Sequence, residues 1–171
     1  MYKRQVLKSD PIIEKSNVTN EWQFHAENVH DFAWAADPDF VQSKLSTPSG
    51  TELNFYHLND TILADNWSRL EDETIELFEI MNDKFGVYPY EQFSVIQAGD
   101  GGMEYPMCTM ISGTGSFGGL VSVTVHEAIH NWYYGVLATN ELKYPWMDEG
   151  FTTFAQNIVL DSLRKSRKDN P

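Results

Sequence analysis

The sequence predicts an α+β architecture, with strands concentrated before residue 60 and paired helices after residue 120. Its 171 residues are enough for one domain with its own core, or for part of a larger one. The hydrophobic content of 42% and aromatic content of 13% are typical of globular chains rather than disordered ones. Strands come first and paired helices follow, which predicts an α+β fold.

The first predicted elements are short strands. Residues 32–36 are apolar and predict a strand, and the Asp-Pro-Asp sequence at 37–39 predicts the turn that follows it. Residues 40–45 and 52–58 flank Thr-Pro-Ser-Gly at 47–50. We expect these two runs to pair as a hairpin.

The longest amphipathic segment spans residues 63–85. Its apolar positions recur every three or four residues, so a helix places them on one face. These positions are Leu63, Trp67, Leu70, Thr74, Leu77, Phe78, Met81 and Phe85. Gly86 follows them and is the expected stop.

Short strands and glycine-rich connections are expected next. Residues 92–98 are rich in β-formers and predict a strand, and residues 107–111 predict another. Glycines predict a loop at 99–102 and an irregular connection at 112–119.

Two helices are predicted in the last third of the chain. Residues 120–137 are apolar with few helix breakers, and Gly135 is placed to close that helix. A second helix is expected to begin near Pro145 and to run to about Lys165.

The first of these helices carries a His-Glu-Ala-Ile-His segment. His126 and His130 are four residues apart, so a helix places both imidazoles on one face, where they can bind one ion. Glu149, after eighteen intervening residues, completes a three-ligand Zn²⁺ set that leaves a fourth position for water. Glu127 can reach that water without binding the metal. Asp148 is open to two interpretations: it orients a ligand, or it charges the first turn of its helix.

A different interpretation makes His126 and His130 core residues of an amphipathic helix. It leaves Glu127 facing a core and gives Glu149 no role. A hydrolytic zinc site is therefore favoured.

Four segments of the chain resemble the zinc aminopeptidases of the aminopeptidase N type, which are gluzincins. The segments are ENVHDFAWAADPDF at 27–40, Gly-Gly-Met-Glu-Tyr at 101–105, HEAIHNWYYG at 126–135 and PWMDEGFTTF at 145–154. The resemblance covers about residues 22–160. It implies that His126, His130 and Glu149 bind zinc and that Glu127 is the general base.

The resemblance also implies a substrate site ahead of the metal helix. Glu104 would hold the free amine of the substrate, which makes the enzyme an exopeptidase that removes single N-terminal residues. Gly101, Gly102 and Met103 would contact the bound peptide. Tyr105 stands where the family usually has asparagine.

The family's catalytic domain is similar to thermolysin, with a strand-rich lobe, the zinc helices and a helical lobe. By this resemblance residues 32–171 are a truncated catalytic domain without the helical lobe, and residues 1–31 lead in from an upstream β-domain. The remaining domains of the parent chain are then expected partners. The truncated chain alone is expected to be a poor catalyst, because in the family the helical lobe supplies a tyrosine that stabilises the tetrahedral intermediate.

The expected substrates are peptides with a free N-terminus. A net charge of −13 argues against a nucleic-acid groove. The charge is explained by solubility, or else it favours the approach of cationic peptide ends. No apolar run has the length of a membrane span and no targeting segment is recognisable, so the compartment is left open. Two alternatives remain: a gluzincin endopeptidase without an amine anchor, and a non-catalytic module in which zinc is a scaffold.

Overall fold

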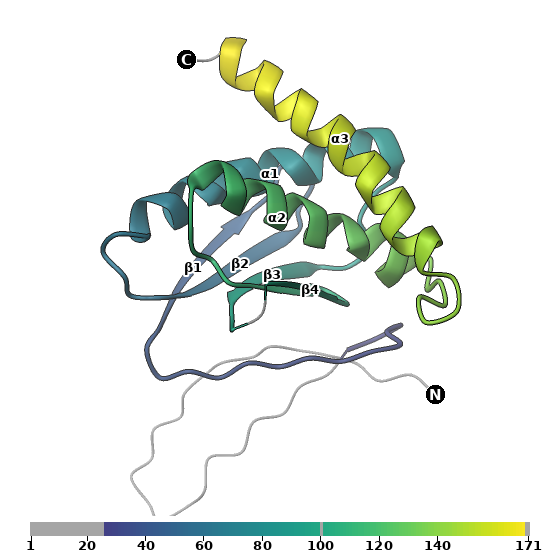
Figure 1. Ribbon diagram of the computed structural model, residues 1–171, viewed down its shortest axis with the longest axis horizontal. Helices are drawn as coiled ribbons and strands as arrows, with labels where there is room; N and C mark the ends of the chain where they lie inside the picture. Colours follow the sequence, from purple (N-terminus) through teal and green to yellow (C-terminus); the bar gives the residue numbers. More distant parts are fainter. Residues whose placement is uncertain (1–25, 100, 170–171) are drawn as a thin grey trace, which may run out of the picture.

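The computed structural model describes residues 26–99 and 101–169, which fold around a five-stranded mixed sheet (Figure 1). The strands are β1 (Phe40–Ser46), β2 (Glu52–Leu58), β3 (Gln92–Gln97), β4 (Gly102–Tyr105) and β5 (Cys108–Ile111). Their order across the sheet is β1-β2-β3-β5-β4. The three central strands run parallel, and each edge strand is antiparallel to its neighbour.

The predicted hairpin is confirmed as β1 and β2. Phe40 pairs with Leu58 and Ser46 pairs with Glu52. The connection closes where the Gly50 N–H donates to the Thr47 carbonyl at 2.9 Å. Gly50 has a φ of 99°, which glycine adopts without steric cost.

The predicted strand at 32–36 is wrong. Phe32 and Trp34 are 44% and 66% exposed, and the segment takes no place in the sheet. A strand is stabilised by the partner beside it, and an apolar run does not by itself supply one. The turn that follows does form, with the Asp39 N–H donating to Asp37 Oδ1 at 2.9 Å. Most of the predicted lead-in, residues 1–25, lies outside the described residues.

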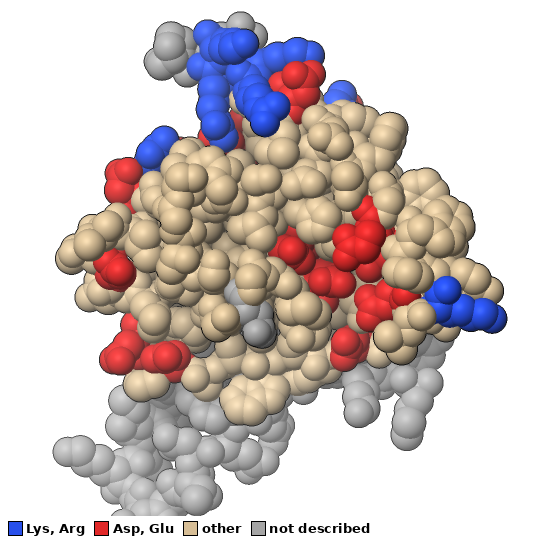
Figure 2. Space-filling model, in the orientation of Figure 1, with Lys and Arg blue, Asp and Glu red and all other residues tan. Residues whose placement is uncertain are grey.

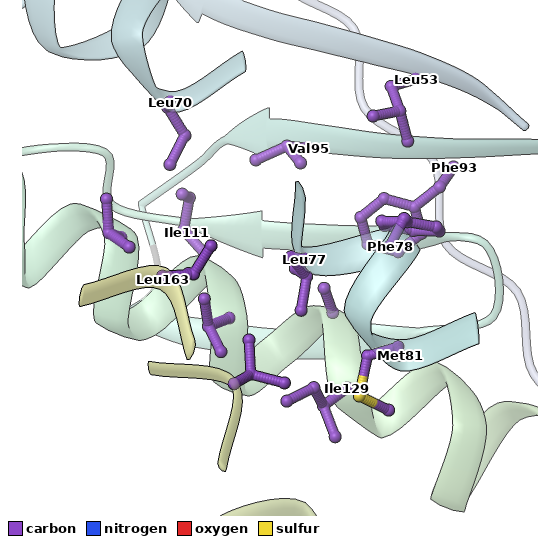
Figure 3. Close-up of a cluster of buried hydrophobic side chains, with 14 of the residues drawn as sticks. Leu53, Leu70, Leu77, Phe78, Met81, Phe93, Val95, Ile111, Ile129 and Leu163 are labelled. Carbon is purple, nitrogen blue, oxygen red and sulfur yellow. The ribbon is translucent and has the colours of Figure 1, made fainter. Parts of the chain in front are cut away.

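The long amphipathic helix is confirmed as α1 (Ala64–Phe85), and it ends at Gly86, whose φ is 118°. Its apolar face packs against the sheet to form the main core (Figure 3). The buried residues of that face are Trp67, Leu70, Thr74, Leu77, Phe78 and Met81. They meet side chains from the strands, among them Leu53, Phe93 and Ile111.

The predicted loop at 99–102 needs correction, because Gly102 already begins β4. The pattern missed β4 since a four-residue strand that starts with glycine carries no recognisable alternation. β4 turns directly back into β5, with Tyr105 paired with Cys108. Glu104 therefore lies on an edge strand of the sheet rather than in a loop.

The turn between β4 and β5 is hydrogen-bonded to Asn131, the residue that follows His130. Met107, in this turn, has a φ of 63°. Its N–H donates to Asn131 Oδ1 at 2.6 Å, and both residues are buried. Asn131 directly follows His130, so this bond holds the hairpin that carries Glu104 against the end of the segment that carries His126 and His130.

The two predicted helices are present with one change in the first. Its residues form α2 (Phe117–His130) and then a π-helix, η1 (Asn131–Val136). The prediction that Gly135 closes this helix is wrong. Gly135 is buried inside η1 and lacks the positive φ of a glycine that ends a helix. The left-handed residue after the helix is Ala138, with a φ of 50°.

The second helix, α3 (Pro145–Asp169), is confirmed and runs four residues beyond its predicted end at Lys165. α2 packs on β4 and β5, and α3 crosses over α2 and α1 on the same side of the sheet (Figure 1). The site is thus bounded by an edge strand, a buried helix and an outer helix. Within the described residues, no helix combines the length and apolar character needed to cross a membrane.

Candidate metal centre

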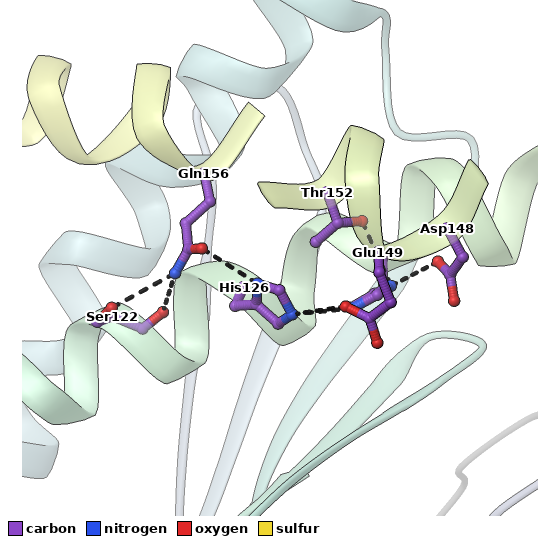
Figure 4. A network of polar contacts seen from close by, with 7 residues as sticks. Ser122, His126, Asp148, Glu149, Thr152 and Gln156 are labelled. Carbon is purple, nitrogen blue, oxygen red and sulfur yellow. Dashed lines mark hydrogen bonds and ion pairs between the residues drawn. The ribbon is translucent and has the colours of Figure 1, made fainter. Parts of the chain in front are cut away.

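The three predicted metal ligands converge where α2 meets the N-terminal part of α3 (Figure 4). His126 and His130 project from successive turns of α2, and Glu149 comes from α3. The Nε2 atoms of the two histidines are 3.2 Å apart. Glu149 Oε2 lies 3.2 Å from His126 Nε2 and 3.6 Å from His130 Nε2. The three donor atoms form a nearly equilateral triangle.

This triangle has the dimensions of a zinc site. Zinc binds imidazole nitrogen and carboxylate oxygen at about 2.0–2.2 Å in tetrahedral geometry, so neighbouring donors lie about 3.3–3.6 Å apart. The observed separations of 3.2–3.6 Å agree closely with that range. Two imidazoles and one carboxylate also leave one tetrahedral position free for water or substrate, as catalytic zinc sites do.

A chain of hydrogen bonds fixes the tautomer of His126. Gln156 Nε2 donates to the Ser122 carbonyl at 3.0 Å, so Gln156 Oε1 is the atom turned toward the histidine. That oxygen lies 3.1 Å from His126 Nδ1 and accepts its proton (Figure 4). His126 Nε2 consequently carries a lone pair directed at the centre of the triangle.

His130 is fixed in the same way by a charged partner. Its Nδ1 lies 2.5 Å from Asp148 Oδ1, and both side chains are almost fully buried, at 1% and 2% exposure. Burial alone would lower the pKa of His130, but the hydrogen bond and negative charge of Asp148 outweigh burial and raise that pKa. Of the two interpretations of Asp148, the contact observed is the one that orients a ligand. Such carboxylate–histidine pairs are typical of zinc sites.

These outer contacts have one electrostatic consequence. With protons on both Nδ1 atoms, two nitrogen lone pairs and the Glu149 carboxylate face one another within 3.6 Å. Three acceptors at that distance repel one another, and a divalent cation between them removes the repulsion. The donor set therefore fits a metal ion, and its mixture of nitrogen and oxygen donors suits zinc.

The Glu127 carboxylate lies between His130 and β4, against Gly102. Its side chain is 7% exposed, and no described residue donates a hydrogen bond to its carboxylate. Burial raises the pKa of Glu127 to about 7; His130 opposes the rise, whereas Glu104, Glu149 and Asp148 add to it. A carboxyl group that titrates near neutral pH can both accept and return a proton.

Gly102 makes room for that carboxylate. A Cβ atom added at Gly102 would lie 2.9 Å from Glu127 Cδ, closer than side chains approach one another. A Cβ atom added at the neighbouring Gly101 would meet nothing within 4 Å. Of these two predicted substrate-site glycines, only Gly102 is required by the packing around the site.

Glu104 lies on β4 beside the metal ligands. One of its oxygens, one of Glu127 and a ring nitrogen of His130 lie within 4.8 Å of one another. A second group joins Glu104 to Glu141 and Asp148 within the same limit. Figure 2 shows acidic side chains gathered on this face, near the end of β4 and the start of α3. The predicted anchor is therefore adjacent to the predicted general base, inside a negative patch.

Met103 is not brought to the carboxylates. Successive side chains of a strand point to opposite faces, so the Met103 side chain lies on the face opposite that of Glu104. Its carbonyl accepts a hydrogen bond from Thr109 Oγ1 at 3.0 Å.

Three residues of the site were missed or left undecided by sequence reasoning: Gln156, Glu141 and Asp148. Gln156 lies seven residues after Glu149, two turns along α3, and this spacing is a usable signal once the helix is known. Glu141 lies in the connection between η1 and α3, where no periodic pattern applies. Asp148 is adjacent to a ligand, but adjacency does not distinguish a contact with His130 from a charge at the helix start.

No family model matches the sequence. The chain is similar in part to leucine aminopeptidase 2 of Chaetomium globosum, with 25% identity over 109 residues, which are 60% of this chain and 18% of that protein. It also matches leucine aminopeptidase 2 of Lodderomyces elongisporus, with 34% identity over 68 residues, which are 37% of this chain and 10% of that protein. The chain thus matches less than a fifth of the length of these curated relatives.

Proposed function

We propose that this chain carries the active site of a zinc-dependent aminopeptidase and forms the strand-rich lobe and zinc helices of a thermolysin-like catalytic domain. One observation carries the proposal. Three donor atoms with zinc-site spacing adjoin two carboxylates, Glu127 and Glu104, that receive no hydrogen bond from the described residues. The partial similarity to two leucine aminopeptidases supports the same class of enzyme.

Each ligand has a defined part in this proposal. His126, His130 and Glu149 hold the ion, while Gln156 and Asp148 keep both imidazoles in the required tautomer. Zinc, when bound, supplies Lewis acidity, which polarises a carbonyl and lowers the pKa of water to about 7.

Glu127 is the proposed general base. Its carboxylate accepts a proton from the attacking water and passes it to the departing amine. In the zinc-free chain burial raises the pKa of Glu127 to about 7, which favours uptake of a proton by this carboxylate. Because Gly102 has no side chain, the Glu127 carboxylate can occupy the space beside it.

Glu104 is the proposed anchor for the substrate's free amine. An oxygen of Glu104 lies within 4.8 Å of the Glu127 carboxylate, so an ammonium group held by Glu104 stands about one residue from the reacting carbonyl. That spacing releases single residues from the N-terminus. The acidic patch around Glu104 favours the approach of a positively charged peptide end.

Two features favour this proposal over its alternatives. A zinc scaffold has four protein ligands and no need for a proton acceptor, whereas this site has three donors and a buried Glu127. An endopeptidase of related architecture has no use for a second carboxylate at the end of its substrate cleft, and Glu104 provides one.

The comparison of free and blocked amines tests the proposal. We expect the complete, zinc-loaded protein to hydrolyse leucine p-nitroanilide and to leave N-acetyl-leucine p-nitroanilide intact. Glu104→Gln should lower kcat/KM for the free-amine substrate about 10- to 100-fold, since a hydrogen bond to a charged group contributes about 1.5–3 kcal/mol. Glu91→Gln, the same change at an exposed position outside the carboxylate groups, is the control. Equal cleavage of the two substrates by the unaltered protein would exclude an aminopeptidase.

A further inference from the structure

A second carboxylate faces Glu104 across the substrate side of the site. Glu141 lies in the connection between η1 and α3, which is folded by short hydrogen bonds such as Glu141 N–H to the Thr139 carbonyl at 3.0 Å. Oxygens of Glu104, Glu141 and Asp148 lie within 4.8 Å of one another. They come from three separate places in the sequence, an edge strand, a loop and the first turn of α3, so only the folded chain brings them together.

A buried acceptor beside this group points to a ligand. Glu127 is only 7% exposed, and it receives no hydrogen bond from the described residues. One of its oxygens lies within 4.8 Å of an oxygen of Glu104. Burying a carboxylate without a donor is costly unless an outside group supplies one. Glu104 and Glu141 likewise receive no hydrogen bond from the described residues. Glu104 belongs to both groups of carboxylates, so acceptors without a donor among the described residues lie on either side of it.

The dimensions of the cluster fit a primary ammonium group. Three oxygens separated by up to 4.8 Å can each lie about 2.8 Å from one central nitrogen, which is the length of a charge-assisted hydrogen bond. An –NH₃⁺ group offers three N–H donors. Asp148 Oδ1 already accepts from His130, so Glu104 and Glu141 are the two carboxylates that are fully available to such a donor.

A second divalent metal fits the same cluster poorly. Calcium takes about six to eight oxygen ligands, and magnesium requires a near-ideal octahedron. Only Glu104 and Glu141 are uncommitted carboxylates here, because Asp148 is shared with the His130 imidazole.

We infer that Glu141 is a second carboxylate of the amine subsite, so that the substrate's α-ammonium is held between Glu104 and Glu141. This inference rests on the aminopeptidase function proposed above. It makes Glu141 a residue that determines specificity for a free, charged N-terminus, and it assigns no part in proton transfer to Glu141.

Binding of small probes tests the inference separately from turnover. Calorimetric titration of the complete, zinc-loaded protein with leucinamide and with N-acetyl-leucinamide measures recognition of the amine directly. We expect Glu141→Gln to weaken leucinamide binding about tenfold, as loss of a charged acceptor does, and to leave N-acetyl-leucinamide unaffected. In hydrolysis, KM for a free-amine substrate should rise while kcat stays nearly constant. Glu91→Gln should match the unaltered protein.

The parallel variant Glu104→Gln separates the possible failures. If Glu104→Gln weakens leucinamide binding and Glu141→Gln does not, the role of Glu141 is refuted and the aminopeptidase proposal stands. If neither variant weakens leucinamide binding, both proposals fail. If Glu141→Gln instead abolishes a calcium or magnesium titration, or lowers the zinc content, the cluster binds metal and the inference is overturned.

Discussion

The two sides of this site differ in how their polar groups are satisfied. On the helical side, each ligand imidazole donates its outer N–H to an acceptor, to Gln156 for His126 and to Asp148 for His130. On the side formed by β4 and the loop before α3, Glu104 and Glu141 receive no hydrogen bond from the described residues. On the helical side both imidazoles are therefore held in one orientation. On the other side two carboxylates have no donor among the described residues.

This difference indicates which kind of ligand each side is suited to bind. Outer hydrogen bonds hold the imidazoles in one tautomer and one orientation, which prepares a fixed geometry for an ion. Carboxylates without donors are suited to a ligand that brings its own N–H groups. Glu127 lies between the two sides, and in the proposed function its buried carboxyl group transfers the proton that links the ion to the substrate.

The largest expected effect comes from the residue between the two sides. Glu127→Gln preserves shape but removes the proton acceptor, so kcat should fall about 10²- to 10⁴-fold. Because Glu127 is outside the ligand triangle, zinc content should stay at one ion per chain. Steady-state kinetics and elemental analysis of the same sample measure both quantities. Loss of zinc together with activity would place Glu127 among the ligands and contradict the division into two sides.

The next effect compares the two outer partners on the helical side. Asp148→Asn should lower zinc affinity about 10- to 100-fold, because loss of such a partner weakens both the orientation and the basicity of the ligand. Gln156→Leu should have a smaller effect, since the His126 side chain is 23% exposed and water can replace the lost acceptor. Zinc titration against a competing chelator gives both affinities. A larger loss of zinc affinity from Gln156→Leu than from Asp148→Asn would contradict the stronger effect expected for the more buried pair, His130 and Asp148.

A smaller effect is expected at the two glycines of the substrate side. Gly102→Ala places a Cβ atom against the Glu127 carboxyl group and should displace it, costing about 1–3 kcal/mol in stability. Gly101→Ala meets no atom within 4 Å and serves as the matched control. Thermal unfolding and kcat, measured for both variants, test the contact. Equal behaviour of the two variants would show that Glu127 does not occupy the space beside Gly102.

The smallest effect expected is a dependence of stability on pH. The pKa of Glu127 is raised by burial to about 7, and the pKa of His130 is raised by Asp148 despite burial. Both groups bind protons more tightly in the folded, zinc-free chain than in the unfolded one, so their contribution is present at acid pH and is lost as pH rises through the folded pKa values. The melting temperature in chelator should therefore fall between pH 5 and pH 8.

Zinc should reverse that trend, because it competes with protons for the histidines and binds more tightly as pH rises. The gain in melting temperature on adding zinc should grow from pH 5 to pH 8. Glu127→Gln should flatten the zinc-free curve, since it removes one of the two titrating groups. A zinc-free curve that rises over this range would contradict the stated pKa directions.

The helical side could be largely predicted from sequence, and the substrate side could not. The i, i+4 spacing of His126 and His130 fixes their common face in any α-helix, whatever the rest of the chain does. Glu149 required the longer motif, because its approach depends on how α3 crosses α2. The amphipathic pattern of α1 likewise predicted the buried face in full.

The remaining features depend on contacts between distant parts of the chain. β4 is four residues long and begins with Gly102, so its only signal is its pairing with β5. The segment at 32–36 shows the opposite error, an apolar run that finds no partner strand. Glu104 was singled out through family resemblance, and Glu141 through neither pattern nor resemblance, since its position beside Glu104 is a result of the fold.

Zinc-edge anomalous diffraction from crystals of the protein tests the central claim most directly. We predict one ion per chain, bound to His126 Nε2, His130 Nε2 and Glu149 Oε2 at about 2.0–2.2 Å, with its fourth position turned toward Glu127. An ion bound elsewhere, or a protein that takes up no zinc while these three side chains keep their present spacing, would contradict it.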